Sequence, residues 1–253
     1  MKNFKSFAHL MLVVCLSMFS LISCIKDDDL IQEEQNSDLA SKAQVESKYQ
    51  TMAATATSIL SATSAWDIPT QFFKANQVYK NNYIHLKQKT GECSWTNYVL
   101  NAGAIARAKG YSYPATYAQV TAVKNWTGSN ALITKLNQYR SANDASKVSG
   151  EIKSFSKNST GRFNMVKQMI NHLDTRKTPF IALASYSGIG HYYIVWSIDW
   201  KVGVTGSEIW FTNTLDPVYS SFDTQVRNMN FSDFLDLMED NPDASYYNSL
   251  FLW

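Results

Sequence analysis

The sequence predicts one α+β domain, in which a helical part packs against an antiparallel sheet. Apolar residues recur at helical spacing over 95–106, whereas residues 179–184 and 191–198 are short apolar runs typical of buried strands. A turn with two glycines at 201–207 separates the second run from a third strand at 208–214. With 253 residues, 45% of them hydrophobic, the chain is long enough for one globular domain with a sizeable core.

The first 23 residues predict an export signal. A short basic start precedes a nearly unbroken apolar run over 7–21, which is shorter than the roughly 20 residues that a membrane-spanning helix needs. Residues 21–24, Leu-Ile-Ser-Cys, resemble the bacterial lipobox, in which cleavage leaves an acylated cysteine at the N-terminus. We therefore expect a lipoprotein signal peptide over 1–23 and lipidation of Cys24. The alternative is an ordinary secretory signal that happens to contain a cysteine.

Residues 24–44 predict a flexible tether between this anchor and the folded domain. The segment begins with the acidic cluster 27–29 and stays polar, so that it has little apolar surface to bury. An acidic cluster directly behind a lipidated cysteine resembles the signal that sends some Gram-negative lipoproteins to the outer face of the outer membrane. A solvated linker explains the same residues. The folded domain is expected over 45–253, at the cell envelope as an outer-membrane lipoprotein exposed on the cell surface.

Charge and composition exclude several classes of function. The formal charge of +2 comes from 23 basic and 21 acidic residues without a long basic run, which argues against a nucleic-acid partner. The sequence has no cluster of histidine, cysteine and carboxylate at metal-ligand spacing and no Gly-rich phosphate loop. We therefore expect a monomer that needs no cofactor and no metal.

Cys93 is the one cysteine that the mature domain is expected to keep. Of the three cysteines, Cys15 lies in the signal and Cys24 would be lipidated. A lone cysteine can be an inert buried side chain. However, a polar, turn-like stretch over 88–92 precedes Cys93, and the helical pattern begins just after it and runs to Gly110. Cys93 is thus predicted at a helix N-terminus, where the helix dipole stabilises the nucleophilic thiolate.

His191 is the preferred base for this thiolate. It follows the small, flexible segment 187–190 and opens an apolar strand, so we expect its imidazole to be accessible. His172 falls on an amphipathic helix over 163–173, where a helix-surface histidine near the C-terminus is the simpler interpretation. His85 lies in a loop or strand without further signal.

A third group should orient the imidazole. A regular hairpin centred near residue 204 would place the partner of His191 near residue 216 or 217, so that Asp216 fits this register. Asn213 is the rival, because an amide oxygen can also accept the imidazole N–H, although simple alternation turns it to the other face. A β-bulge in the hairpin would reverse the preference.

These segments together resemble the papain-like cysteine peptidases, with the bacteriocin-processing peptidases and the staphopains as the nearer relatives. The resemblance spans roughly residues 85 to 225 and rests on the following stretches: Gly91-Glu92-Cys93-Ser94-Trp95, Lys177-Thr178-Pro179, Gly190-His191-Tyr192-Tyr193-Ile194-Val195 and Leu215-Asp216-Pro217. It implies a papain-like fold, with cysteine on a helix first and histidine on a sheet later. In those families a glutamine about six residues before the cysteine donates to the substrate oxyanion. Gln88, five residues before Cys93, is the candidate here.

The expected function is peptide or amide hydrolysis through a Cys-His-Asp or Cys-His-Asn triad with a thioester intermediate. The expected partners are a protein or peptide substrate and, through the lipid anchor, a membrane. Two alternatives stay open. One is another thiol acyl-transfer enzyme, such as a peptidoglycan amidase or a transglutaminase-like protein, and the other is a surface binding or adhesion module with an idle thiol.

Overall fold

The computed structural model describes residues 59–128, 132–201, 203–242 and 244–253. The signal peptide 1–23, the tether 24–44 and Cys24 lie outside the described residues. The elements, in chain order, are these: η2 Ile59–Ser61, η3 Ala65–Asp67, β1 Gln71–Lys74, α3 Gln77–Asn81, α4 Cys93–Ala108, α5 Tyr117–Thr127, α6 Ile133–Tyr139, the π-helical η4 Arg140–Asp144, β2 Gly150–Ser156, α7 Ser159–Thr175, β3 Phe180–Tyr186, β4 Ile189–Lys201, β5 Gly203–Thr212, α8 Phe222–Gln225, β6 Val226–Asn230, α9 Phe231–Glu239 and β7 Tyr246–Leu252.

One antiparallel sheet of 7 strands organises the domain. Its order is β2-β7-β3-β4-β5-β6, and β1 also pairs with β4. The long strand β4 makes this possible, since residues 189–195 pair with β3 while residues 197–200 pair with β1. β4 is therefore the central strand, and it carries His191 near its beginning.

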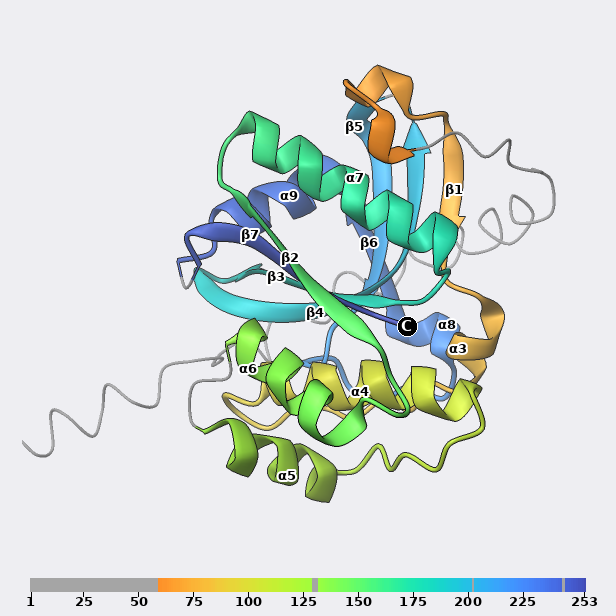
Figure 1. Cartoon of the computed structure of the whole chain (residues 1–253), viewed down its shortest axis with the longest axis vertical. Helices are drawn as coiled ribbons and strands as arrows, with labels where there is room; N and C mark the ends of the chain where they lie inside the picture. Colours follow the sequence, from red (N-terminus) through yellow and green to blue (C-terminus); the bar gives the residue numbers. More distant parts are fainter. Residues whose placement is uncertain (1–58, 129–131, 202, 243) are drawn as a thin grey trace, which may run out of the picture.

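Helices cover both faces of the sheet, as Figure 1 shows: α4, α5 and α6 lie on one face and α7 and α9 on the other. Alternating residues of the strands supply the two cores. In β3, Ile181 and Leu183 pack with α4, whereas Phe180 and Ala182 pack with α7 and α9. Burial on both faces explains why the strands read as continuous apolar runs in the sequence.

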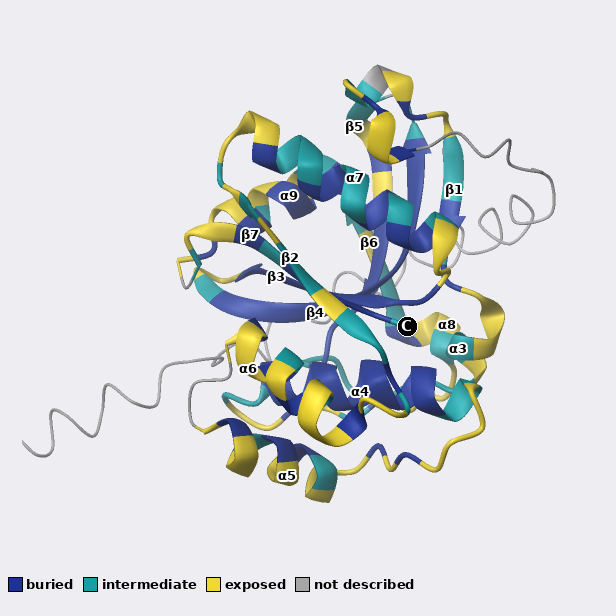
Figure 2. Cartoon of the chain, in the orientation of Figure 1, coloured by how far each residue is buried: buried dark blue, intermediate teal, exposed yellow. Residues whose placement is uncertain are grey.

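Helix α4 is buried along almost its whole length, and Figure 2 shows it in dark blue between the sheet and the outer helices. The predicted helix that begins after the 88–92 turn is confirmed. Its C-cap is Lys109, and Gly110 follows with φ of +85°, a left-handed conformation that ends helices and favours glycine. Because α4 is packed against the sheet, its first residue, Cys93, has a fixed position in the domain.

The structure differs from the sequence analysis at two places. The Ser-, Lys- and Asn-rich stretch 141–161, whose pattern indicates a loop, contains the strand β2, which pairs with β7 at the edge of the sheet. An edge strand with one neighbour tolerates Lys and Ser, so its apolar pattern is weak. The turn predicted over 201–207 is also shorter than expected, because β5 already begins at Gly203.

None of the helices in the described ranges is long and apolar enough to cross a membrane.

Candidate active site

Cys93 is the first residue of α4, as predicted. The chain enters the helix through Gly91, whose φ of +73° a larger residue would adopt only under strain, and through Glu92, the N-cap. The Glu92 carboxylate does not cap the helix but pairs with Lys124 of α5 at 3.0 Å. Cys93 is 7% exposed and, among the described residues, forms no disulfide. The thiol thus sits at the positive end of a buried helix.

His191 lies on β4 opposite Ala184 of β3 and is fully buried, with 0% exposure. The expectation that small neighbours leave the imidazole accessible is therefore wrong. The rings of Tyr186 and Tyr193, with centroids 5.6 and 4.8 Å from that of His191, flank it on the sheet. His191 belongs to the interior, whereas Cys93, Asn213 and Gln88 each retain a little exposure, 6 to 7%.

The side-chain oxygen of Asn213 accepts a hydrogen bond from the imidazole of His191. Its Oδ1 lies 2.9 Å from His191 Nε2 and also accepts the backbone N–H of Leu215 at 3.0 Å. The turn N–H of Leu215 therefore holds the amide with its oxygen toward the histidine. The tautomer with hydrogen on Nε2 satisfies this contact and leaves the lone pair on Nδ1.

The hairpin of β4 and β5 is not regular, because its pairing has two register shifts, one of them between Asp199 and Lys201. Between Val195 and Ser197 the pairing of β4 with β5 shifts by one residue, so that Ile194 lies opposite Thr212. The strand ends there, and the turn that follows brings Asn213 to His191. Of the two candidates, Asn213 is the one whose side chain contacts the imidazole of His191.

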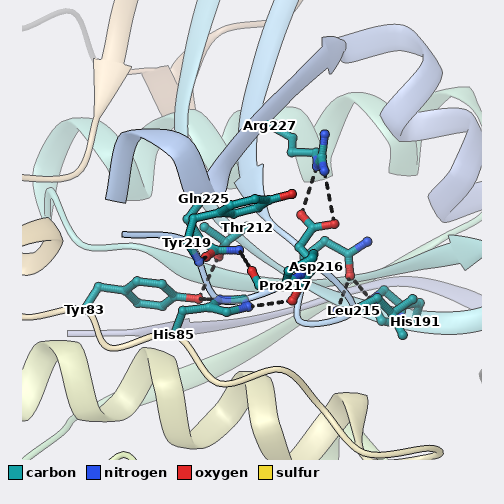
Figure 3. Close-up of polar contacts among 11 residues, drawn as sticks. Tyr83, His85, His191, Thr212, Leu215, Asp216, Pro217, Tyr219, Gln225 and Arg227 are labelled. Carbon is teal, nitrogen blue, oxygen red and sulfur yellow. Dashed lines mark hydrogen bonds and ion pairs between the residues drawn. The ribbon is translucent and has the colours of Figure 1, made fainter. Parts of the chain in front are cut away.

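Asp216 has another partner. Its carboxylate pairs with Arg227 of β6 at 2.9 Å, and Figure 3 shows it turned toward Arg227 and away from His191. The backbone oxygen of Asp216 lies 3.2 Å from His85 Nε2. Asp216 thus fixes the turn that carries Asn213.

Gln88 is held against the same turn. Its backbone N–H donates to Thr214 O at 2.7 Å, and its side-chain Oε1 accepts from the Thr214 hydroxyl at 2.5 Å. Gln88 is 6% exposed, and its Nε2 has no hydrogen-bond partner within the described part of the chain. A buried amide donor without an acceptor costs free energy, about 1 to 3 kcal/mol. Such a donor is available to a substrate oxygen.

Asn97 contacts the segments that carry Cys93, His191 and Asn213, and the sequence analysis did not identify it. Its Nδ2 lies 2.8 Å from Cys93 O, 2.9 Å from Tyr192 O and 2.9 Å from Thr214 Oγ1. These contacts bring the first turn of α4 against the residue after His191 and the residue after Asn213. The available signal was an asparagine four residues after Cys93, on the same face of a helix that is otherwise mostly apolar.

The other two histidines in the described part of the chain, His85 and His172, are buried and hydrogen-bonded. His172 is 5% exposed rather than on the helix surface, and its Nε2 contacts the Thr178 hydroxyl at 2.8 Å. Burial, with Arg176 nearby, lowers the pKa of His172 to about 3. Burial also lowers the pKa of His85, whose Nδ1 lies 2.9 Å from the Tyr83 hydroxyl.

No three residues of the types His, Cys, Asp and Glu lie close enough together in the described ranges to hold a metal ion. One hollow of about 220 Å³ lies between α7 and the end of β7, and it contains none of the five predicted site residues. It is lined by Glu151, Gln168, Asn171, His172, Thr175, Arg176, Phe251 and Trp253.

No protein-family model matches the chain, and no curated protein is significantly similar to it. Among solved structures, the crystal structure of UfSP from C. elegans is similar with a TM-score of 0.48 and 13% sequence identity, over 77% of this chain and 36% of that chain. A likeness of this size assigns no function.

Proposed function

We propose that the domain is a cysteine hydrolase of amide bonds, with Cys93 as nucleophile, His191 as base and Asn213 as the residue that orients the imidazole. The observation that carries the proposal is the buried His191–Asn213 pair, at 2.9 Å, beside the first turn of the helix that begins at Cys93. Nucleophile, base and orienting group in this order are the parts that thiol acyl transfer requires.

In the acylation step the Cys93 thiolate attacks the carbonyl carbon of the substrate. A C–S bond forms, and the π electrons of the carbonyl move onto its oxygen. When the tetrahedral intermediate collapses, the C–N bond breaks and the His191 imidazolium gives its proton to the leaving nitrogen. The products of this half are a thioester on Cys93 and a free amine.

In the deacylation step the imidazole takes a proton from water, and the oxygen of that water attacks the thioester carbon. The C–S bond breaks, the acid leaves, and the sulfur is released as thiolate beside the imidazolium, which restores the pair that began the cycle. Asn213 serves both steps because its Oδ1 holds the hydrogen on Nε2 and so keeps Nδ1 as the nitrogen that exchanges the proton.

Gln88 is the donor proposed for the oxyanion. Its Oε1 is taken by Thr214, which leaves Nε2 as the donating end, and no acceptor in the described residues reaches that nitrogen. The backbone N–H groups of the first turn of α4 also point out of the helix end beside Cys93. Donors placed in advance at the developing charge are typically worth a factor of about 10² to 10³ in rate.

One observation favours a second function, that of a binding module with an idle thiol. Cys93 is only 7% exposed and His191 is not exposed at all, so a substrate must displace neighbouring atoms to reach them. The two functions differ in the reactivity of the thiol, which is measurable without knowledge of the substrate.

The test is alkylation of Cys93 by limiting iodoacetamide between pH 5 and 8, followed by peptide mass mapping, which separates Cys93 from Cys15 and Cys24. An ordinary thiol with a pKa near 8.5 is about 0.3% thiolate at pH 6. Rapid labelling at pH 6 that His191→Ala abolishes supports the hydrolase. Slow labelling that rises tenfold per pH unit and is insensitive to His191→Ala would leave the binding module.

A second experiment addresses peptidase activity itself. Digestion of a proteome-derived peptide mixture, read by mass spectrometry, should reveal new N-termini with the native chain and none with Cys93→Ala. If the thiol is activated but no peptide is cut, the acyl donor belongs to another class of amide, such as the peptide stems of peptidoglycan.

We also propose that the domain works at the cell envelope, tethered by a lipid on Cys24. The support is the lipobox-like stretch 21–24 and the acidic cluster 27–29 behind it. In cells labelled with a tagged fatty acid, the native chain should carry the label and Cys24→Ser should not. Equal labelling of the two would exclude the anchor at this residue.

A further inference from the structure

Asn97 contacts all three segments that carry the proposed catalytic residues. One side-chain nitrogen, Nδ2, is within 2.9 Å of the backbone oxygen of Cys93, the backbone oxygen of Tyr192 and the hydroxyl of Thr214. Tyr192 follows His191 and Thr214 follows Asn213. Asn97 itself is fully buried, so water does not compete for these contacts.

The chemistry of the contacts fixes the orientation of the amide. Two of the three partners are backbone carbonyl oxygens, which accept only, so a rotated amide would place Oδ1 against two other oxygens. With Nδ2 in place, Oδ1 is buried without a partner within the described residues. The domain therefore bears the cost of one unsatisfied acceptor and keeps a three-way contact at the site.

We propose that Asn97 is a positioning residue, which holds the helix of Cys93, the strand of His191 and the turn of Asn213 in one relative placement. The inference rests on the proposed function, because it concerns the geometry of that thiol–imidazole pair. Loss of the amide would let α4 and the 213–216 turn move independently. A displacement of about 1 Å at reacting groups can cost on the order of 10²-fold in rate.

Asn101 provides a matched control. It lies one turn later in α4, is also fully buried, and also has an Oδ1 without a partner among the described residues. Its Nδ2 donates to Pro179 O at 3.3 Å, at the entry to β3, and not to any of the three segments. Asn97→Ala and Asn101→Ala should therefore damage the core similarly and the site differently.

The experiment measures the pH profile of Cys93 alkylation by iodoacetamide, together with the thermal unfolding midpoint, for the native chain and both variants. We expect both variants to lower the midpoint by similar amounts. Asn97→Ala should lower the labelling rate at pH 6 by tenfold or more, toward the profile of an ordinary thiol. Asn101→Ala should stay within twofold of the native rate.

Asn97→Ser keeps the inference falsifiable if Asn97→Ala does not fold. A serine hydroxyl can still bond to the carbonyl four residues earlier in the helix, but it does not reach Tyr192 O. Its labelling rate should therefore lie between those of the native chain and the alanine variant. A native profile in either Asn97 variant, or an equal change in Asn101→Ala, overturns the positioning role. If Cys93 of the unsubstituted chain is labelled slowly, and His191→Ala does not change that rate, the hydrolase proposal is refuted, and the role of Asn97 with it.

Discussion

Asn213 Oδ1 lies 2.9 Å from His191 Nε2, at the end of a strand whose register is displaced by a bulge. A neutral amide in this position holds the imidazole without adding a negative charge beside it. Asp216 instead pairs with Arg227 on the next strand, where it stabilises the turn.

The two candidate residues should behave differently on substitution. Asn213→Ala removes the acceptor at Nε2, so the imidazole can take the wrong tautomer, and we expect kcat/KM to fall by about 10²-fold or more. Asp216→Asn removes an ion pair that is partly exposed and should cost about 1 kcal/mol of stability or less. Steady-state kinetics and urea unfolding of both variants separate these effects. A larger kinetic loss in Asp216→Asn would reinstate Asp216 as the orienting group.

Gln88 should affect kcat rather than KM. Gln88→Met keeps the volume but removes both the Nε2 donor and the Oε1 acceptor, and we expect kcat to fall by about 10² to 10³. The lost Thr214 contact should cost about 1 kcal/mol of stability. Thr214→Val removes the same contact and keeps Nε2, but it also removes one contact of Asn97, so its kinetic loss is an upper limit for the part that the Thr214 contact contributes. A native kcat in Gln88→Met would show that Gln88 Nε2 does not donate to the oxyanion.

The local features of the site could be predicted from the sequence, and the long-range ones could not. The helix beginning at Cys93 and the strand beginning near His191 follow from apolar spacing and from glycine turns on either side. The approach of Asn213 to His191 depends on the register of the β4–β5 hairpin, which shifts at two places, and no sequence pattern marks an irregular pairing.

Burial of polar groups is the second limit of the sequence. His172 and Asn97 are polar residues of helices, a context typical of a surface, yet both are buried. Asn97 contacts Thr214, which is distant in the chain, and His172 contacts Thr178, whose hydroxyl also donates to Leu252 O at the other end of the domain sequence. Strand β2 escaped prediction for a related reason. It is an edge strand whose place is set by β7, nearly 100 residues later in the chain, and not by its own composition.

Acid should destabilise the domain through His172. Burial lowers the pKa of this group to about 3 in the folded state, whereas in the unfolded chain it returns to its ordinary value of 6.5. Between these values the unfolded state binds more protons, so stability is complete above pH 6.5 and falls as the pH drops toward 3. The slope contributed by this group approaches about 1.4 kcal/mol per pH unit.

His172→Gln tests this slope, because glutamine does not titrate and can still donate to the Thr178 hydroxyl. Urea unfolding at pH 4, 5, 6 and 7 should show a shallower loss of stability in the variant. Some slope should remain, since burial also lowers the pKa of His85. Identical slopes in the two proteins would mean that His172 is already protonated in the folded state over this range.

Gly161 in the first turn of α7 should not accept a side chain. A Cβ at this position would lie 2.0 Å from the backbone oxygen of Ser156, the last residue of β2, and neither backbone can move without separating α7 from the sheet. We expect Gly161→Ala to lower the free energy of unfolding by about 3 kcal/mol or more, at the upper end of overpacking effects.

Gly103→Ala in α4 is the comparison, since its Cβ would meet mainly the end of the Arg107 side chain, at 2.8 Å. The gain of about 1 kcal/mol for alanine in a helix interior should offset part of that contact. Thermal unfolding should therefore rank native and Gly103→Ala well above Gly161→Ala, and equal midpoints for the two variants would contradict the close approach of β2 to α7.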